Sequence, residues 1–371
     1  MNKQAKKELA LLLGIGTITA LFFRKSKWAA GLGIGMVGLV LSNLKKSDSY
    51  KEKSVVITGG SRGLGLALAR RFVSEGANVS LLARDFKELN RAEHILKLYG
   101  AGKEQVMIYP CDITDDDQLL KTLENIIMVR GEIDILVNNA GAIIVGPFDS
   151  MAMEDFEAQM KLHLFANISL TKKVLPHFRR RGEGRIINIC SMGGKVAVPH
   201  MIPYDSSKFA LAGFSQGITA ELAQENISVT TVYPALIRTG SPIQAVFKGD
   251  AKKEFNWFAN SDVFPWLSMD ANVAAERIVE ASRERRTEFI PSVVGRARMM
   301  AGAFFPELLS YTMSLINRVM PKGTMQSYRT GAQCLTDESY LTAGLEKTSR
   351  DAEESLNQKK KRDAEFNLGL H

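Results

Sequence analysis

Short, mostly apolar runs rich in β-branched residues recur along the middle of the chain and alternate with longer amphipathic stretches. Such runs are typical of strands buried on both faces of a parallel sheet. They lie at residues 54–57, 78–83, 106–109, 133–137, 185–189 and 228–232. Helical patterns fill the intervals, so the sequence predicts repeated βα units. The expected fold is α/β, a Rossmann-like doubly wound parallel sheet with helices on both faces.

The first 53 residues follow a different pattern. Two uncharged apolar stretches, 10–23 and 28–44, flank the basic residues Arg24, Lys25 and Lys27, and a polar linker leads on to residue 53. Each stretch is shorter than the ~20 residues that a helix needs to cross a bilayer. Their apolar character nevertheless leads us to expect that residues 1–53 anchor the protein at a membrane. Because the stretches are short, the form of the anchor stays open between a single span, a re-entrant hairpin and interfacial helices. The domain that follows would face the cytoplasm.

Charge indicates which macromolecular surface the chain could bind, and cysteine spacing bears on metal sites and on the redox compartment. The net charge is +8, and residues 1–53 alone hold ten basic and three acidic side chains. Because these lysines flank apolar runs, the excess favours a membrane surface over nucleic acid. The cysteines Cys111, Cys190 and Cys334 are scattered. They have neither metal-ligand nor disulfide spacing, so we expect no metal site and a reducing compartment.

A glycine-rich turn follows the first apolar run, and a helical pattern begins after it. The turn reads Thr58-Gly59-Gly60-Ser61-Arg62-Gly63-Leu64-Gly65. Its glycines permit a tight turn, and the helix N-terminus offers N–H groups to a pyrophosphate. The turn therefore predicts a dinucleotide site; the alternative is a βα turn that holds no ligand.

The end of the second run bears on the choice of cofactor. It reads Ala83-Arg84-Asp85. An acidic residue there would bind the adenosine ribose of NAD. Arg84 and Arg62 could instead clasp a 2′-phosphate, because guanidinium matches phosphate geometry. This favours NADP(H), and Asp85 keeps NAD(H) possible; either arginine could also be a solvated surface charge.

Three residues form a candidate catalytic group. Tyr204 and Lys208 are one helical turn apart, and Ser191 lies upstream. A phenol has a pKa of about 10, and a neighbouring cation favours the phenolate. The trio could hold a carbonyl oxygen through a hydroxyl group and pass it a proton.

Together these segments resemble the short-chain dehydrogenase/reductase family over residues 54–240, in a membrane-associated form. The motifs occur in order as Thr58-Gly59-x-x-x-Gly63-x-Gly65, Asp112-Ile113-Thr114, Asn138-Asn139-Ala140-Gly141, Ser191, Tyr204-x-x-x-Lys208 and Pro234-Ala235-Leu236-Ile237-Arg238-Thr239. For the enzyme chemistry, the resemblance implies that Tyr204 is the general acid/base. Lys208 would bind the nicotinamide ribose and lower the pKa of Tyr204, and Ser191 would hydrogen-bond the substrate oxygen.

The resemblance also implies a set of cofactor contacts. Asp112 would contact adenine, with Ile113 lining its pocket, and Asn139, Ala140 and Gly141 would form the wall beside the adenosine ribose. The segment with Pro234, Ile237 and Thr239 would reach the nicotinamide carboxamide or the phosphate.

Two positions depart from the family pattern. His163 stands where an asparagine usually anchors a water of the proton relay. It could hold that water and shuttle a proton, or it could be a structural substitute; Asn167 is another candidate for the missing amide. Ala235 stands where a glycine is usual, and we expect it to stiffen the loop without removing activity.

The region beyond residue 240 is less regular. Aromatic residues between 241 and 264 (Phe247, Phe255, Trp257 and Phe258) fit an apolar lid or ordinary packing. Residues 296–320, interrupted by Pro306, suggest an interfacial or docking helix pair, with core packing and self-association as alternatives. From about residue 345 the chain reads as a solvated helix or loose tail.

These observations predict three parts: an anchor and linker (1–53), a catalytic domain (54–295) and a helical extension with a polar tail (296–371). The expected function is an NADP(H)-dependent carbonyl reductase or alcohol dehydrogenase that acts on an apolar substrate and can form a homo-oligomer. The alternatives are an NAD-linked dehydrogenase working in the oxidative direction and, because of His163, a non-catalytic nucleotide-binding scaffold at the membrane.

Overall fold

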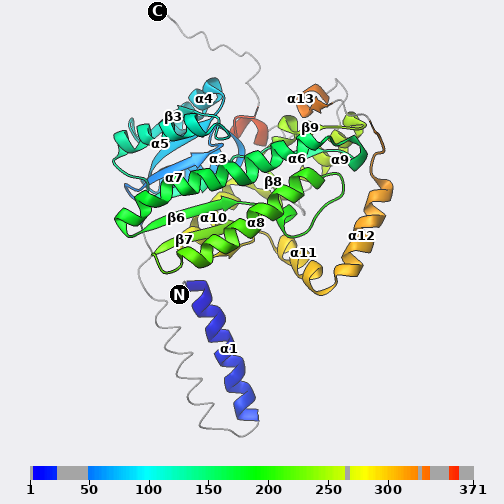
Figure 1. The fold of residues 1–371 in the computed structure, drawn as a ribbon, viewed down its shortest axis with the longest axis horizontal. Helices are drawn as coiled ribbons and strands as arrows, with labels where there is room; N and C mark the ends of the chain where they lie inside the picture. The colour runs from blue at the N-terminus through cyan, green and yellow to red at the C-terminus, as the bar shows by residue number, and fades with distance from the viewer. Residues whose placement is uncertain (1–2, 23–48, 264–267, 325–327, 335–350, 359–371) are drawn as a thin grey trace, which may run out of the picture.

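The computed structural model describes residues 3–22, 49–263, 268–324, 328–334 and 351–358. In this part of the chain, seven parallel strands form the central sheet in the order β11-β7-β6-β4-β1-β2-β3 (Figure 1). The strands are β1 (Ser54–Thr58), β2 (Asn78–Ala83), β3 (Val106–Pro110), β4 (Ile135–Asn138), β6 (Gly184–Ile189), β7 (Ile227–Val232) and β11 (Glu288–Phe289). The predicted α/β fold is confirmed, and each predicted run forms a strand within two residues of its expected bounds.

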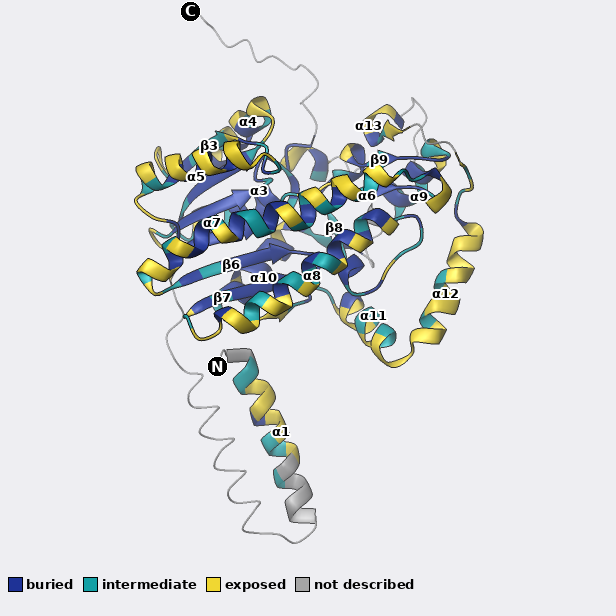
Figure 2. Ribbon diagram, viewed as in Figure 1, coloured by how far each residue is buried: buried dark blue, intermediate teal, exposed yellow. Residues whose placement is uncertain are grey.

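Helices cover both faces of this sheet, and the strands lie buried between them (Figure 2). One face packs against α3 (Gly63–Ser74), α4 (Phe86–Leu98) and α10 (Ala271–Arg283). The other packs against α5 (Asp116–Arg130), α7 (Ala166–Arg181) and the end of α8 (Ile202–Leu222). Burying apolar side chains on both faces is the main stabilising contribution in such a layered fold. It also holds the carboxyl ends of the strands in fixed positions.

A smaller unit lies beside the carboxyl ends of the strands. It contains the strands β5 (Ile144–Val145), β9 (Val246–Phe247), β12 (Arg329–Thr330) and the pair β8 (Leu236–Arg238) and β10 (Ser268–Asp270), with the helices α6 (Met153–Met160), α9 (Ala251–Val263) and α13 (Gly331–Cys334). Phe247 and Phe255 are fully buried and meet edge to face, 5.4 Å between ring centroids. The aromatic residues of this region thus form a small core of their own, as the ordinary-packing alternative expects.

The helices α11 (Val293–Phe304) and α12 (Pro306–Val319) form an elbow at the edge of the molecule (Figure 2). The chain turns at Pro306, as its position in the sequence predicts, because proline suits the first turn of a helix and not its interior. Every residue of α12 is exposed or half-buried, and Phe304, Phe305, Leu308 and Tyr311 are each at least 60% exposed. The elbow therefore presents an apolar outer surface.

Membrane spans were sought among the described residues. None of their helices, including α1 (Lys3–Phe22), is by itself long and apolar enough to cross a bilayer. Taken together, α11 and α12 have the length and composition, but they are bent by 117°. The second apolar stretch, 28–44, lies outside the described residues.

Residues 351–358 differ from the expected solvated tail. Residues 351–355 form a short helix, and Leu356, Asn357 and Gln358 after it are buried. Leu356 joins the apolar core on the α3 side of the sheet. The expectation was wrong for this segment because its partners are far away in sequence, where local composition carries no information about them.

Candidate active site

The glycine-rich turn after β1 is braced by side chains from two neighbouring strands. At the end of β1, the Thr58 hydroxyl accepts hydrogen bonds from the backbone N–H groups of Asn139 and Ala140, each at 3.0 Å. The Asn139 carboxamide donates to the carbonyl oxygens of Thr58 (2.9 Å) and Gly59 (3.1 Å). These bonds tie the carboxyl ends of β1 and β4 together where the strand order reverses. In open α/β sheets, this is where ligands bind.

Two glycines of the turn are required by the local geometry. Gly59 has a φ of 62°, which favours glycine. A Cβ on Gly65 would lie 2.1 Å from the Gly59 carbonyl oxygen, so a side chain there would displace the turn. The first N–H groups of α3 have no acceptor within their own helix. Gly141, on the facing loop, is exposed. A backbone cradle at a helix N-terminus suits the diphosphate of a dinucleotide.

Arg62 and Arg84, the two arginines expected at a 2′-phosphate, differ in their surroundings. The Arg62 guanidinium is 2.6 Å from a carboxylate oxygen of Glu88, and the Ser61 hydroxyl donates to the other oxygen at 3.1 Å. Arg84 is exposed. The Asp85 carboxylate caps α4 by accepting the Glu88 N–H at 3.0 Å. In this structure Glu88 neutralises Arg62, and Asp85 has a structural partner.

The remaining cofactor candidates lie on loops around the same edge. Asp112 follows β3 and accepts hydrogen bonds from the Thr114 N–H and hydroxyl, and the neighbouring Ile113 is buried. On the opposite side, the Pro234 carbonyl accepts from Met192, and Ile237 lies in β8. Thr239 is buried and faces the turn: a Cβ on Gly63 would meet its Cβ at 3.7 Å. Leu64 is half-buried beside it.

The three catalytic candidates are brought to one place by β6 and α8. Ser191 follows β6, and its hydroxyl accepts the Gly193 N–H at 3.0 Å. Tyr204 and Lys208 lie one turn apart on α8, with the Lys208 ammonium 5.6 Å from the centroid of the Tyr204 ring. A side-chain hydrogen bond links Ser191 to Tyr204. The hydroxyl groups of both residues can therefore reach one substrate oxygen.

The pKa values of this group differ from the expectation in one respect. Burial raises the pKa of Tyr204, and the hydrogen bond with Ser191 opposes this rise only in part. Lys208 donates to the Ile189 carbonyl at 3.0 Å, and burial lowers its own pKa to about 8. The expected lowering of the Tyr204 pKa by Lys208 is not found, because desolvation disfavours both charged forms. The phenol is thus protonated and can donate its proton.

His163 lies in a single π-helical turn, Lys161–Phe165, between α6 and α7. Its Nδ1 is 2.7 Å from the Ser207 hydroxyl, which itself donates to the Tyr204 carbonyl oxygen. Its Nε2 accepts the Ala142 N–H at 3.2 Å. Nδ1 therefore carries the proton, and burial beside Lys208 lowers the pKa of His163 well below its usual value.

Both ring nitrogens of His163 already have protein partners, which fits the structural alternative better than a water-holding one. The imidazole packs edge to face on Tyr204, 5.4 Å between centroids. The His163 side chain thus joins the loop at Ala142, beside the glycine turn, to Ser207 on α8. Asn167 is buried and donates to the His163 carbonyl at 2.7 Å, so it supports this turn.

Two acidic residues of the site were missed from the sequence. Glu88 neutralises Arg62, but no local pattern marks it. Asp205, next to Tyr204, is 2% exposed and accepts the Val198 N–H, and burial raises its pKa to about 7. The sequence signal for Asp205 is only its position in the Tyr204–Lys208 stretch, which does not mark it as buried.

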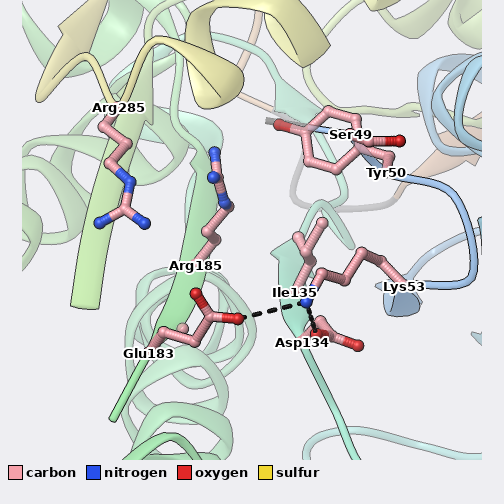
Figure 3. A pocket seen from close by; sticks show the side chains of 9 residues that line it. Ser49, Tyr50, Lys53, Asp134, Ile135, Glu183, Arg185 and Arg285 are labelled. Carbon is pink, nitrogen blue, oxygen red and sulfur yellow. Dashed lines mark hydrogen bonds and ion pairs between the residues drawn. The ribbon is translucent and has the colours of Figure 1, made fainter. Parts of the chain in front are cut away.

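A separate hollow lies at the opposite, amino-terminal edge of the sheet (Figure 3). Lys53 reaches Asp134 (2.8 Å) and Glu183 (3.2 Å) there, and Arg181 also pairs with Asp134. Asp134 further accepts the Ser54 N–H at the start of β1. These ion pairs fasten the amino ends of the strands. Among the described residues, no group of three or more His, Cys, Asp or Glu side chains could hold a metal ion.

The family model described as short chain dehydrogenase matches residues 53–246, about half of the chain and the whole of the braced turn and catalytic group. The chain belongs to the short-chain dehydrogenase family. This short-chain dehydrogenase is 31% identical over 282 residues to a fatty acyl-CoA reductase of Acinetobacter baylyi, a match that covers 75% of the chain and 88% of the relative. It is 36% identical to a dehydrogenase/reductase SDR family protein 7-like of Anopheles gambiae, covering 58% of the chain and 70% of the relative.

Solved structures resemble this short-chain dehydrogenase as well. A metagenomic short-chain oxidoreductase in complex with NADP shares 26% identity with a TM-score of 0.53, covering 66% of this chain and 100% of that one. L-sorbose reductase of Gluconobacter frateurii, complexed with NADPH and L-sorbose, shares 27% identity with a TM-score of 0.58, covering 66% and 97%. The protein is thus an oxidoreductase of a family that uses NAD(P)(H).

Proposed function

We propose that this short-chain dehydrogenase is an NADP(H)-dependent reductase that converts an apolar, lipid-like carbonyl compound into an alcohol. The observation that carries the proposal is the geometry of Tyr204, whose hydroxyl shares a hydrogen bond with Ser191 and whose ring lies 5.6 Å from the Lys208 ammonium; burial raises the pKa of the phenol and keeps it protonated. A protonated phenol is a proton donor, which is what carbonyl reduction needs at the substrate oxygen.

The residues of the turn fit a dinucleotide. The cradle at Gly59, Gly63 and Gly65 would hold the diphosphate, and Lys208 and Thr239 would hold the nicotinamide half. When bound, the reduced nicotinamide supplies a hydride for the carbonyl carbon. The Ser191 hydroxyl donates a hydrogen bond to the carbonyl oxygen as negative charge develops there. Tyr204 transfers its hydroxyl proton to that oxygen, which completes the alcohol.

The preference for NADP(H) is supported by charge. Asp85, the acid that would favour NAD, already caps α4, whereas Arg84 is exposed and, with Arg62, would be available to a 2′-phosphate. Two structural relatives are complexes with NADP or NADPH. Arg62 must exchange its partner Glu88 for the phosphate, so the preference depends on that exchange.

The apolar substrate and a membrane location are supported by separate observations. One relative is named a fatty acyl-CoA reductase. Residues 1–53 combine apolar stretches with ten basic side chains, and the elbow α11–α12 exposes large apolar residues. Both surfaces fit a lipid interface, with the catalytic domain on the cytoplasmic side.

The experiment is to measure consumption of NADPH and of NADH with carbonyl compounds of increasing chain length. We expect turnover with NADPH, with kcat/KM rising as the alkyl chain lengthens. Faster turnover with NADH, or oxidation of alcohols only, would support the NAD-linked dehydrogenase instead. Nucleotide binding without turnover of any carbonyl would support the non-catalytic scaffold.

A further inference from the structure

The C-terminal segment 351–358, here called the latch, lies on the dinucleotide-binding turn. Figure 1 shows its short red helix between α4 on one side and β9 and α13 on the other, beside the carboxyl ends of the strands. The Gly63 N–H, at the start of α3, donates to the Leu356 carbonyl at 2.9 Å. One of the donors that the turn offers to a diphosphate is therefore already used by the chain itself.

Asn357 fastens the latch to the turn and to α4. Its carboxamide N–H groups donate to the carbonyls of Ser61 (2.7 Å) and Glu88 (3.0 Å), and its carboxamide oxygen accepts from Arg91 at 2.9 Å. The residue is 3% exposed and has a φ of 59°, a conformation that asparagine tolerates better than most residues. Both N–H groups and one lone pair of the Asn357 carboxamide thus bond to the turn or to α4.

The other side of the latch contacts the loop that carries Thr239. Gln244 donates to the Gln358 carbonyl at 3.0 Å. A Cβ on Gly240 would lie 2.5 Å from the Glu353 side chain, and one on Gly63 would lie 3.0 Å from the Gln358 carboxamide. The latch therefore bridges the two loops between which the diphosphate and nicotinamide parts of the cofactor would lie.

The latch carries negative charge, as does the cofactor diphosphate that would bind at the same turn. Asp351, Glu353 and Glu354 give it a negative charge, and Glu353 is 2% exposed against Gly240. Negative charge on a segment in contact with the turn disfavours a diphosphate there. Through Asn357 the latch also holds Glu88, whose carboxylate neutralises Arg62, the arginine expected at the 2′-phosphate.

We propose that residues 351–358 are an autoinhibitory latch that occupies the dinucleotide-binding turn and must withdraw when the cofactor binds. The proposal rests on the proposed function, because it needs a dinucleotide at this turn. In the closed state the Gly63 N–H has a partner in the latch; in the open state it is free for phosphate, whereas Arg62 must still exchange Glu88 for the phosphate. The measured affinity for NADPH is then reduced by the fraction of molecules that are closed.

The test compares the full chain with Asn357→Ala and with a matched control, Ser355→Ala, whose uncharged side chain is exposed within the same segment. NADPH dissociation constants are measured by titration of nicotinamide fluorescence, without substrate. We expect Asn357→Ala to bind NADPH about tenfold more tightly, the effect of one or two lost net hydrogen bonds in the closed state. The control should bind as the unaltered chain does. Unchanged or weaker binding by Asn357→Ala would overturn the latch.

Hydrogen exchange of the unaltered chain gives a second readout that needs no variant. We expect saturating NADPH to speed exchange at the amides of residues 356–358, because the latch leaves the turn. Increased protection of these amides would show a clamp on bound cofactor and contradict autoinhibition. If neither the full chain nor Asn357→Ala binds NADPH or NADH, the proposed function itself fails. Binding with equal affinity in both overturns the latch alone.

Discussion

Burial sets the protonation states of the candidate catalytic residues and of His163 beside them. Tyr204 keeps its proton and His163 stays neutral because each lies where a charge is poorly solvated. The same burial makes Lys208 easier to deprotonate, with a pKa lowered to about 8. A protonated phenol beside an ammonium that loses its charge near neutral pH is an arrangement suited to reduction below that pH.

We predict that kcat/KM for carbonyl reduction falls as pH rises above about 8, because Lys208 then loses the charge that binds the ribose and supports the proton relay. A lowered pKa means that the charged form predominates below about 8 and is lost above it. The measurement is the pH profile of kcat/KM, which reports the free enzyme. Lys208→Arg, which stays charged, should move the alkaline limb upward; a limb that does not move would contradict this assignment.

His163 is predicted to act as a brace and not as a proton carrier. His163→Asn should lower the free energy of unfolding by about 1–3 kcal/mol, because it removes a buried partner of Ser207 or Ala142. The shape of the pH profile near neutral pH should stay unchanged, because the lowered pKa of the imidazole keeps it uncharged there. Thermal unfolding measures the change in stability, and the pH profile of kcat/KM measures the effect on catalysis. Loss of an acidic limb from the profile of the variant would instead indicate proton transfer by His163.

Asp205 makes the stability of the folded chain depend on pH. Burial raises its pKa to about 7, although Arg298 opposes the rise, so the folded chain binds a proton that the unfolded chain releases near pH 4. The stabilisation is complete below that value and is lost as pH rises through about 7. We expect the free energy of unfolding to decline by at most about 1.4 kcal/mol per pH unit in this window. Denaturant unfolding of Asp205→Asn should show a smaller decline, and an equal decline would assign it elsewhere.

At the scale of elements, the glycine turn and the helix α8 differ in how closely their glycines are packed. The turn between β1 and α3 depends on close backbone contact, with Gly65 against the Gly59 carbonyl oxygen. Along α8, by contrast, a Cβ added at Gly213 would meet nothing within 4 Å. The same substitution should therefore have opposite effects at the two sites.

Gly65→Ala should destabilise the protein by about 1–3 kcal/mol and abolish dinucleotide binding, because the turn must move to admit a methyl group. Gly213→Ala is the matched control, and it should stabilise α8 by up to about 1 kcal/mol because alanine is the better helix former. Thermal unfolding and NADPH titration of both variants test the pair. Normal NADPH binding by Gly65→Ala would show that the turn is not the dinucleotide site.

The sequence predicted the strands and the glycine turn because their signals are local. Asn78–Ala83 was expected as a strand and forms β2 with those bounds, since a buried strand needs only a short apolar run. The contact between Asn357 and Ser61 joins residues 296 positions apart, and no periodic pattern encodes it. The pairing of Arg62 with Glu88 was missed for a related reason: the two residues are 26 positions apart, and only the packing of α4 beside the turn brings them together.

At the scale of the whole molecule, the catalytic domain begins before its first strand. Tyr50 is 2% exposed, packs on Phe72 with 5.3 Å between centroids, and donates to the Val279 carbonyl. A chain that starts at Ser49 keeps this contact and lacks the apolar stretches and most of the basic residues of the predicted anchor. The predicted anchorage can therefore be tested apart from the folded domain.

Removal of residues 1–48 should leave NADPH affinity and thermal stability nearly unchanged but greatly weaken binding to anionic lipid vesicles, because each lysine near such a surface contributes about 1 kcal/mol. Cosedimentation with vesicles of mixed neutral and anionic lipid measures the loss. Vesicles of neutral lipid alone serve as the control for the apolar contribution of the elbow α11–α12. Undiminished binding to anionic vesicles after the truncation would contradict the predicted anchor.

The most direct test of the account is NADPH consumption with a long-chain aldehyde or ketone by the unaltered enzyme and by Tyr204→Phe. The substitution removes only the hydroxyl that donates the proton. We predict a fall in kcat of about 10²–10⁴-fold, the usual contribution of a positioned general acid, with an unchanged dissociation constant for NADPH. Turnover by Tyr204→Phe at the rate of the unaltered enzyme would contradict the mechanism.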